Sequence, residues 1–121
     1  MSLLSLVSNC AIAEWVDIGA TETKTIYADP TTIRKNGHIV KMWRLYDLKD
    51  AIVTKEVGPY KSSKVQHEFD CKMERTRILY ITAFSGNMGK GKVVYAGVGP
   101  LNWTPVSPSS TDKVLWDFAC K

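Results

Sequence analysis

The chain has 121 residues, of which 45% are hydrophobic, a content that suits one hydrophobic core and is too small for two. Its net charge of +4 comes from 16 Lys and Arg residues against 12 Asp and Glu residues. These charges are interspersed, without a run of five or six of one sign, which argues against a nucleic-acid-binding protein. We therefore expect a single domain with a weak attraction for acidic partners.

The first thirteen residues, MSLLSLVSNCAIA, carry no charge and end in Ala11-Ile12-Ala13, the small-x-small spacing that signal peptidases recognise. We interpret residues 1–13 as the remnant of a signal peptide and residues 14–121 as one mature domain, exported to the periplasm or the outer cell surface. A lipid anchor on Cys10 is disfavoured, because Asn9 stands where such motifs carry a small residue. No later stretch has the 18 or more apolar residues needed to cross a bilayer.

Removal of this leader leaves two cysteines, Cys71 and Cys120. An even pair in an exported protein predicts a disulfide. Closing a loop of about fifty residues would stabilise the domain by about 4 kcal/mol. Because these cysteines and the two histidines, His38 and His67, lack the short spacing of metal ligands, we expect neither a metal nor a cofactor.

Alternation of apolar and polar residues, typical of half-buried strands, dominates most of the chain. It predicts strands at Trp15 to Ile18, Thr23 to Ala28, His38 to Leu48, Lys64 to Glu74, Arg77 to Phe84 and Lys92 to Gly97. Asp29-Pro30-Thr31 and Asn36-Gly37 predict turns that break the run. The segment 47–58 is looser and predicts a loop or a short strand.

The clearest alternation runs from Lys64 to Glu74. It places Cys71 and His67 on the apolar face of this strand and Asp70 on the solvent face. A histidine on such a face is expected to be a packed core residue and not a catalytic base.

The C-terminal segment changes to a helical period. Ser107 is the expected N-cap and Pro108 the expected first helical residue. One face of this helix carries Thr111, Val114, Leu115, Phe118 and Ala119, and can lie on the sheet. The fold class predicted is therefore α+β: an antiparallel sheet of about six strands packed by a C-terminal α-helix, with one disulfide.

Few residues suggest chemistry. The loop GNMGKGK at 86–92 superficially suggests a phosphate cradle, but it lacks Lys followed by Ser or Thr and a strand follows it, so a hairpin loop is favoured. Neither a nucleophile with its base nor an acid–base pair is visible, and we expect no enzyme. The residues expected to bind a partner are the basic loop residues Arg34, Lys35, Lys90 and Lys92, and Trp116, for which packing at the sheet edge is preferred over a partner contact.

Several short motifs together resemble the surface-adhesin protein E family of small exported Gram-negative proteins. They are Ile26-Tyr27-Ala28-Asp29, Thr32-Ile33-Arg34 with Gly37, Val40 to Leu45 around Trp43, Tyr60-Lys61-Ser62, Phe69-Asp70-Cys71, Ser85-Gly86-Asn87-Met88-Gly89, and Trp103 to Pro105 before Pro108, Ser109 and Cys120. The resemblance covers nearly all of the mature chain.

This resemblance implies an antiparallel sheet of about six strands whose C-terminal helix is tied by a disulfide. It also implies a place in the periplasm or at the cell surface, an adhesin function towards host extracellular-matrix and serum proteins, and a homodimer. Our leading hypothesis is an exported, non-enzymatic protein that binds a protein partner. The alternative is a periplasmic envelope module that binds a small ligand or a peptide, which a deep apolar pocket with converging polar groups would favour.

Overall fold

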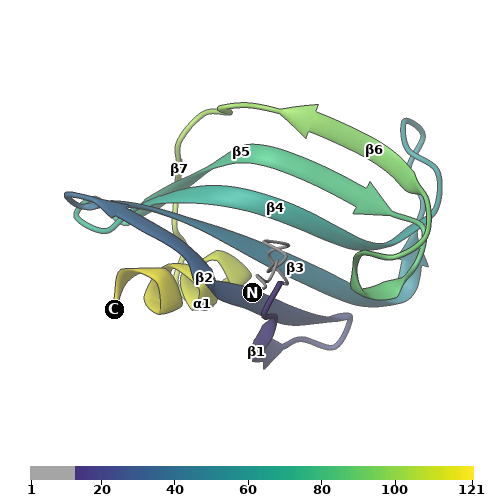
Figure 1. The fold of residues 1–121 in the computed structure, drawn as a ribbon, viewed down its shortest axis with the longest axis horizontal. Helices are drawn as coiled ribbons and strands as arrows, with labels where there is room; N and C mark the ends of the chain where they lie inside the picture. Colours follow the sequence, from purple (N-terminus) through teal and green to yellow (C-terminus); the bar gives the residue numbers. More distant parts are fainter. Residues whose placement is uncertain (1–12) are drawn as a thin grey trace, which may run out of the picture.

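The computed structural model describes residues 13–121; most of the predicted leader, with Cys10, lies outside the described residues. The elements are β1 (Val16–Ala20), β2 (Lys24–Asn36), β3 (Ile39–Ile52), β4 (Tyr60–Asp70), β5 (Arg75–Phe84), the short 3₁₀ helix η1 (Asn87–Gly89), β6 (Val93–Val98), β7 (Thr104–Pro105) and α1 (Thr111–Cys120). Figure 1 shows their arrangement.

The sheet is an antiparallel meander in which each strand pairs with the next along the chain, in the order β1-β2-β3-β4-β5-β6. The short β7 pairs with the beginning of β5. The β2–β3 and β4–β5 turns lie at one end of the sheet, and the β3–β4 and β5–β6 connections lie at the other end (Figure 1). The predicted α+β fold, with its antiparallel sheet and C-terminal helix, is confirmed.

Two turns predicted from the sequence, one inside β2 and one at its end, can be compared with the structure. The Asn36-Gly37 turn is confirmed, and Gly37 adopts a φ of 63°, in the left-handed region that suits glycine. The predicted break at Asp29-Pro30-Thr31 is wrong, because β2 continues through it as an irregularity in the pairing with β3. The Asp29 carboxylate accepts hydrogen bonds from the backbone N–H and hydroxyl of Thr31, so the local turn is absorbed within the strand.

Strand β4 ends at Asp70, four residues before the predicted end. The Asp70 carboxylate accepts hydrogen bonds from the backbone N–H groups of Lys72 and Met73, at 3.1 and 3.0 Å, and from Arg75 Nε at 2.9 Å. These bonds turn the chain away from the strand, so that Cys71 lies in the turn after β4. Its side chain is partly buried against the hydrophobic core, on the inward side that the alternation predicts. The prediction that Asp70 is solvated is also wrong, since its side chain is 1% exposed.

Helix α1 begins three residues later than the predicted N-cap would place it. Ser110 is the N-cap, and its hydroxyl accepts a hydrogen bond from Lys113 N at 3.1 Å. Ser109 has a positive φ of 64°, so the helix cannot extend back through it to Ser107. No helix among residues 13–121 is long and apolar enough to span a membrane.

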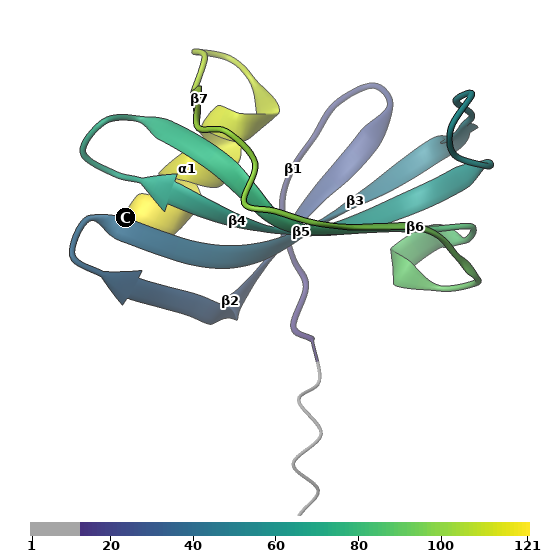
Figure 2. The ribbon, with the colours of Figure 1, turned by 90° about the horizontal axis from the view of Figure 1, so that it is seen from above.

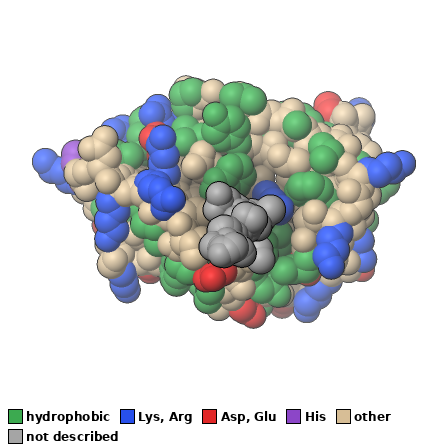
Figure 3. All heavy atoms as spheres, viewed as in Figure 1, with side chains coloured by type: hydrophobic (Ala, Val, Ile, Leu, Met, Phe, Trp, Pro, Cys, Tyr) green, Lys and Arg blue, Asp and Glu red, His purple; other side chains and the backbone are tan. Residues whose placement is uncertain are grey.

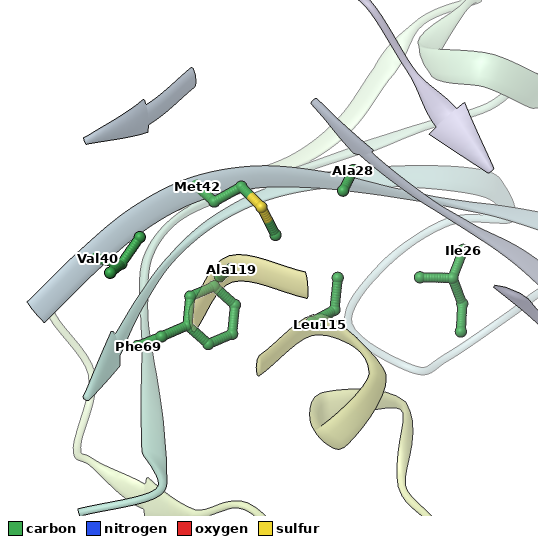
Figure 4. Close-up of a cluster of buried hydrophobic side chains, with 7 residues drawn as sticks. All are labelled: Ile26, Ala28, Val40, Met42, Phe69, Leu115 and Ala119. Atoms are coloured by element: carbon green, nitrogen blue, oxygen red, sulfur yellow. The ribbon is translucent and has the colours of Figure 1, made fainter. Parts of the chain in front are cut away.

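The helix lies on one side of the twisted sheet (Figure 2). Its wholly buried residues, Leu115 and Ala119, point into the strands below (Figure 4). The cluster they join consists of apolar side chains from β2, β3 and β4: Ile26, Ala28, Val40, Met42 and Phe69. This core fills the space beneath α1, which covers the end of the sheet near the β2–β3 turn (Figures 1 and 2). We refer to the side of the sheet that carries α1 as the helix side.

Candidate functional site

Cys71 and Cys120 form the predicted disulfide, with 5.6 Å between their Cα atoms and 49 residues of sequence separation. It ties the end of α1 to the turn that follows β4. The neighbouring Trp116 indole Nε1 donates a hydrogen bond to the carbonyl oxygen of Asp70 at 3.0 Å. Both contacts fix the C-terminal helix against the sheet.

Trp116 packs partly buried against the hydrophobic core, as preferred from the sequence. The Lys113 ammonium lies 4.5 Å from the centroid of its ring. The indole therefore has a structural position, and a contact with a partner stays a prediction.

The basic residues expected to bind a partner lie at opposite ends of the sheet. Arg34 and Lys35 are exposed beside the β2–β3 turn, whereas Lys90 and Lys92 are exposed in the β5–β6 connection. On the face opposite α1, Lys and Arg side chains gather towards both ends, with hydrophobic side chains between them (Figure 3). The structure thus separates the four predicted residues into two pairs.

The end near the β2–β3 turn concentrates positive charge around a hollow. Arg34, Lys35 and Lys41, which we call the basic end, line a depression of about 280 Å³ together with Glu68. Glu68 is already bound by Arg77, whose Nε lies 2.8 Å from its carboxylate. None of the three basic-end side chains has a carboxylate partner among residues 13–121.

The β5–β6 connection is the hairpin loop that the sequence favoured over a phosphate cradle. The backbone N–H of Met88 donates to Asp47 Oδ1 at 2.7 Å, and that of Gly89 donates to the Ser62 hydroxyl at 2.9 Å. Because these donors are already bonded to the sheet, they do not point at an open phosphate site.

A buried arginine on the helix side was not anticipated from the sequence. Arg44, on β3, is 7% exposed and shares a strand face with the core residues Val40 and Met42. Its Nε donates to His67 Nε2 at 3.2 Å and its Nη1 donates to the Ser63 hydroxyl at 3.1 Å. Both acceptors are neutral, and no ion pair of the described residues includes Arg44. The guanidinium is therefore a buried cation that forms no ion pair with a carboxylate within residues 13–121; Asp112 attracts it only from beyond ion-pair distance.

His67 is held in its neutral form. The Thr76 hydroxyl donates to the carbonyl oxygen of Glu68, so it accepts a hydrogen bond from His67 Nδ1 at 3.0 Å. This arrangement puts the proton on Nδ1 and leaves the Nε2 lone pair for Arg44. Burial and the nearby Arg44 charge lower the pKa of His67 to about 3. The expected packed core histidine is confirmed: His67 is 3% exposed and stacks on Phe69.

Tyr46 lies between two cations. The Arg44 guanidinium carbon is 3.5 Å from the centroid of the Tyr46 ring, and the Lys24 ammonium is 4.5 Å from it. Burial lowers the pKa of Arg44 to about 10, so this group stays charged at neutral pH. Burial and the Arg44 charge also lower the pKa of Lys24. The site therefore holds two positive charges close together.

Two cavities adjoin Arg44 and Tyr46. The helix cavity, of about 470 Å³, lies beside the start of α1 and includes Asp112. The loop cavity, of about 380 Å³, lies between the sheet and the β3–β4 connection and includes Lys24. The β3–β4 connection rises on the same side of the sheet as α1 (Figure 2). Converging polar groups and apolar walls are features of ligand-binding pockets.

One feature of the sequence could have indicated that Arg44 is buried. It is a charged residue whose alternation places it with Val40 and Met42 on a face that is otherwise apolar. Its partners His67 and Ser63 lie 23 and 19 residues away, and only the pairing of β3 with β4 brings them to it.

Among residues 13–121, no group of three or more His, Cys, Asp or Glu side chains could hold a metal ion.

Comparison with known proteins identifies both a family and a fold. The model of the family described as surface-adhesin protein E matches residues 15–121. No curated protein matches the sequence.

Solved structures of Haemophilus influenzae protein E have the same fold. One aligns with a TM-score of 0.62 at 11% identity, covering 95% of this chain and 90% of that chain. Its crystal form II aligns with a TM-score of 0.59 at 12% identity, covering 91% and 96%. Protein E from non-typeable H. influenzae aligns with a TM-score of 0.59 at 13% identity, covering 97% and 82%. The structural likeness supports the fold, and the family match over nearly the whole chain shows that it belongs to the surface-adhesin protein E family.

Proposed function

We propose that this chain is an exported, non-enzymatic binding protein that acts as a cell-surface adhesin and recognises host or matrix proteins. The observation that carries the proposal is the family match over residues 15–121. The disulfide between Cys71 and Cys120 supports an oxidising compartment, because such bonds persist mainly in exported proteins. The partner is therefore a protein met at the cell surface.

The basic end is the surface that best suits such a partner. Arg34, Lys35 and Lys41 surround a hollow and lack carboxylate partners among the described residues, so their charges are available to an acidic protein surface. Arg34 Nη1 also donates to the carbonyl oxygens of Thr31 and Ile33, which orders its guanidinium. Positive patches of this kind steer and orient acidic partners.

Retention on immobilised matrix proteins tests this function. The purified, oxidised protein is expected to bind at least one of laminin, fibronectin, vitronectin and collagen, and to lose binding as ionic strength rises. Reversing two charges with Arg34→Glu and Lys35→Glu is expected to reduce retention roughly tenfold at low salt.

Matched variants locate the effect. Lys49→Glu with Lys55→Glu makes the same change in net charge at exposed positions outside the basic end, and is expected to leave retention intact. Lys90→Glu with Lys92→Glu tests the opposite end of the sheet. If the folded protein binds none of the panel, the adhesin function is overturned. If only the Lys90 and Lys92 pair matters, the basic end is not the binding surface.

A second candidate function is the periplasmic module that binds a small ligand or a peptide. The specific observation in its favour is the pair of cavities at Arg44, where apolar walls and polar groups converge. Binding of small molecules at this position, measured apart from adhesion, distinguishes it from the adhesin function.

The homodimer implied by the family resemblance stays a prediction. Strand β6 is an edge of the sheet and carries the exposed side chains of Val93 and Val98. Light scattering coupled to gel filtration at increasing protein concentration tests self-association, with a mass twice that of the monomer as the expected result.

A further inference from the structure

We infer that the loop cavity is a binding site for a carboxylate attached to an apolar body, with Arg44 and Lys24 holding the anion. This inference rests on the second candidate function alone, and adhesion can succeed or fail without changing it.

The first argument is that Arg44 has no carboxylate within ion-pair distance among residues 13–121. A buried ion is costly unless an opposite charge compensates it, yet the hydrogen bonds of Arg44 go to the neutral groups of His67 and Ser63. They use its Nε and one N–H of Nη1, and no bond from Nη2 to a residue within 13–121 is found. The guanidinium thus keeps donors that a carboxylate could accept in charge-assisted hydrogen bonds.

The second argument is the charge around each cavity. The loop cavity is lined by two cations, Lys24 and Arg44, and by no Asp or Glu. The helix cavity contains the carboxylate of Asp112 as well as Arg44. An anion is therefore favoured in the loop cavity and disfavoured next to Asp112.

The third argument is the chemistry of the remaining walls, which selects the rest of the ligand. The loop cavity has five aliphatic side chains and four neutral side chains with hydroxyl groups besides the Tyr46 ring. The aliphatic ones are Leu48, Ile52, Val57, Ile81 and Ala83; the hydroxyl-bearing ones are Thr54, Tyr60, Ser63 and Tyr95. Its volume of about 380 Å³ is at the small end of the range for ligand pockets, which is roughly 300–1,000 Å³. A small acid with an apolar or aromatic body matches these walls.

Titration of the full chain, labelled with ¹⁵N, with 3-phenylpropionate tests the site directly. We expect amide shifts at Arg44, Tyr46, Ser63 and Ile81. The matched probes 3-phenylpropan-1-ol and 3-phenylpropylamine, which replace the carboxylate by a hydroxyl and an ammonium, should bind at least roughly tenfold more weakly. Equal binding of the three probes at these residues would overturn the carboxylate assignment and leave the second candidate function standing. Binding of none of them would overturn both.

Variants assign the anion contact. Arg44→Gln should weaken 3-phenylpropionate binding by roughly ten- to hundred-fold and reduce the preference over the alcohol to what Lys24 alone provides. Arg44→Lys should keep that preference, since it keeps the charge. Lys41→Gln removes an exposed charge on the same strand and should leave binding unchanged. Arg44→Met, which replaces the charge by an apolar side chain, supplies a second folded variant, and full binding by any folded variant lacking the Arg44 charge would contradict the inference.

Peptide ligands distinguish two sources of the carboxylate, the C-terminus of a peptide and a free small acid. A hexapeptide ending in leucine is compared with the same peptide carrying a C-terminal amide. Tighter binding of the free acid than of the amide supports a peptide C-terminus as ligand, whereas binding of 3-phenylpropionate but of neither peptide supports a free small acid.

Discussion

Replacing Cys71 and Cys120 with serine opens a loop closed by residues 49 apart and releases the end of α1 from the sheet. In the chain-entropy description of a disulfide, a loop of this length is worth about 4 kcal/mol. A domain of this size is expected to have a total stability of roughly 6–18 kcal/mol. The double variant should therefore lose a large part of its stability. The ten-residue helix has little stability of its own and should be the element most affected.

Guanidinium unfolding followed by circular dichroism and Trp fluorescence measures this loss. With an m-value of about 4 kcal/mol/M, the midpoint should fall by about 1 M. The wild-type protein treated with a reductant is the matched control and should unfold at the same midpoint as the serine variant. A loss of less than about 1 kcal/mol in both would refute the reasoning that this loop closure stabilises the fold.

Three further changes test the packing and the buried polar groups. Leu115→Ala, at a wholly buried position under α1, should cost about 2–5 kcal/mol in the free energy of unfolding. Asp70→Asn weakens the carboxylate's bonds to Lys72 N, Met73 N and Arg75, and should cost about 1–3 kcal/mol in the same assay. The pKa of His67 is lowered to about 3 in the folded protein, so between pH 6.5 and pH 3 this residue binds a proton in the unfolded chain and stays neutral in the folded one. The free energy of unfolding should therefore fall as pH drops from 6.5 towards 3. His67→Gln should flatten this slope when unfolding is measured at pH 4 and pH 7; an unchanged slope would contradict the neutral, buried state of His67.

The strands and the helix could be predicted because apolar residues recur along the sequence with the period of each element. Alternation marked the strand containing His67, and the helical spacing of Leu115 and Ala119 marked the face that meets the sheet. The end of β4 could not be found in this way. The alternation continues past Asp70, and what ends the strand is the capture of two backbone N–H groups by a carboxylate, which leaves the polarity pattern unchanged.

The candidate binding surfaces were harder to predict than the strands and the helix, because the pairing of distant strands decides which residues come together. Sequence reasoning selected basic residues by type, and the meander then placed Arg34 and Lys35 at one end and Lys90 and Lys92 at the other. The Arg44 site was missed because the feature that distinguishes it is the absence of a paired carboxylate, and a sequence pattern does not show which groups lie around a side chain. A buried arginine usually has a carboxylate partner, and only the complete set of neighbours shows that Arg44 has neutral acceptors.

The adhesin function is tested most directly by the location of the protein on intact native cells. Labelling with a reagent that does not cross the membrane, followed by fractionation, separates protein exposed on the outer surface from protein held in the periplasm. The proposed function predicts that the native protein is labelled on intact cells and is recovered with the outer surface. Recovery of unlabelled, soluble protein from the periplasmic fraction would contradict an adhesin.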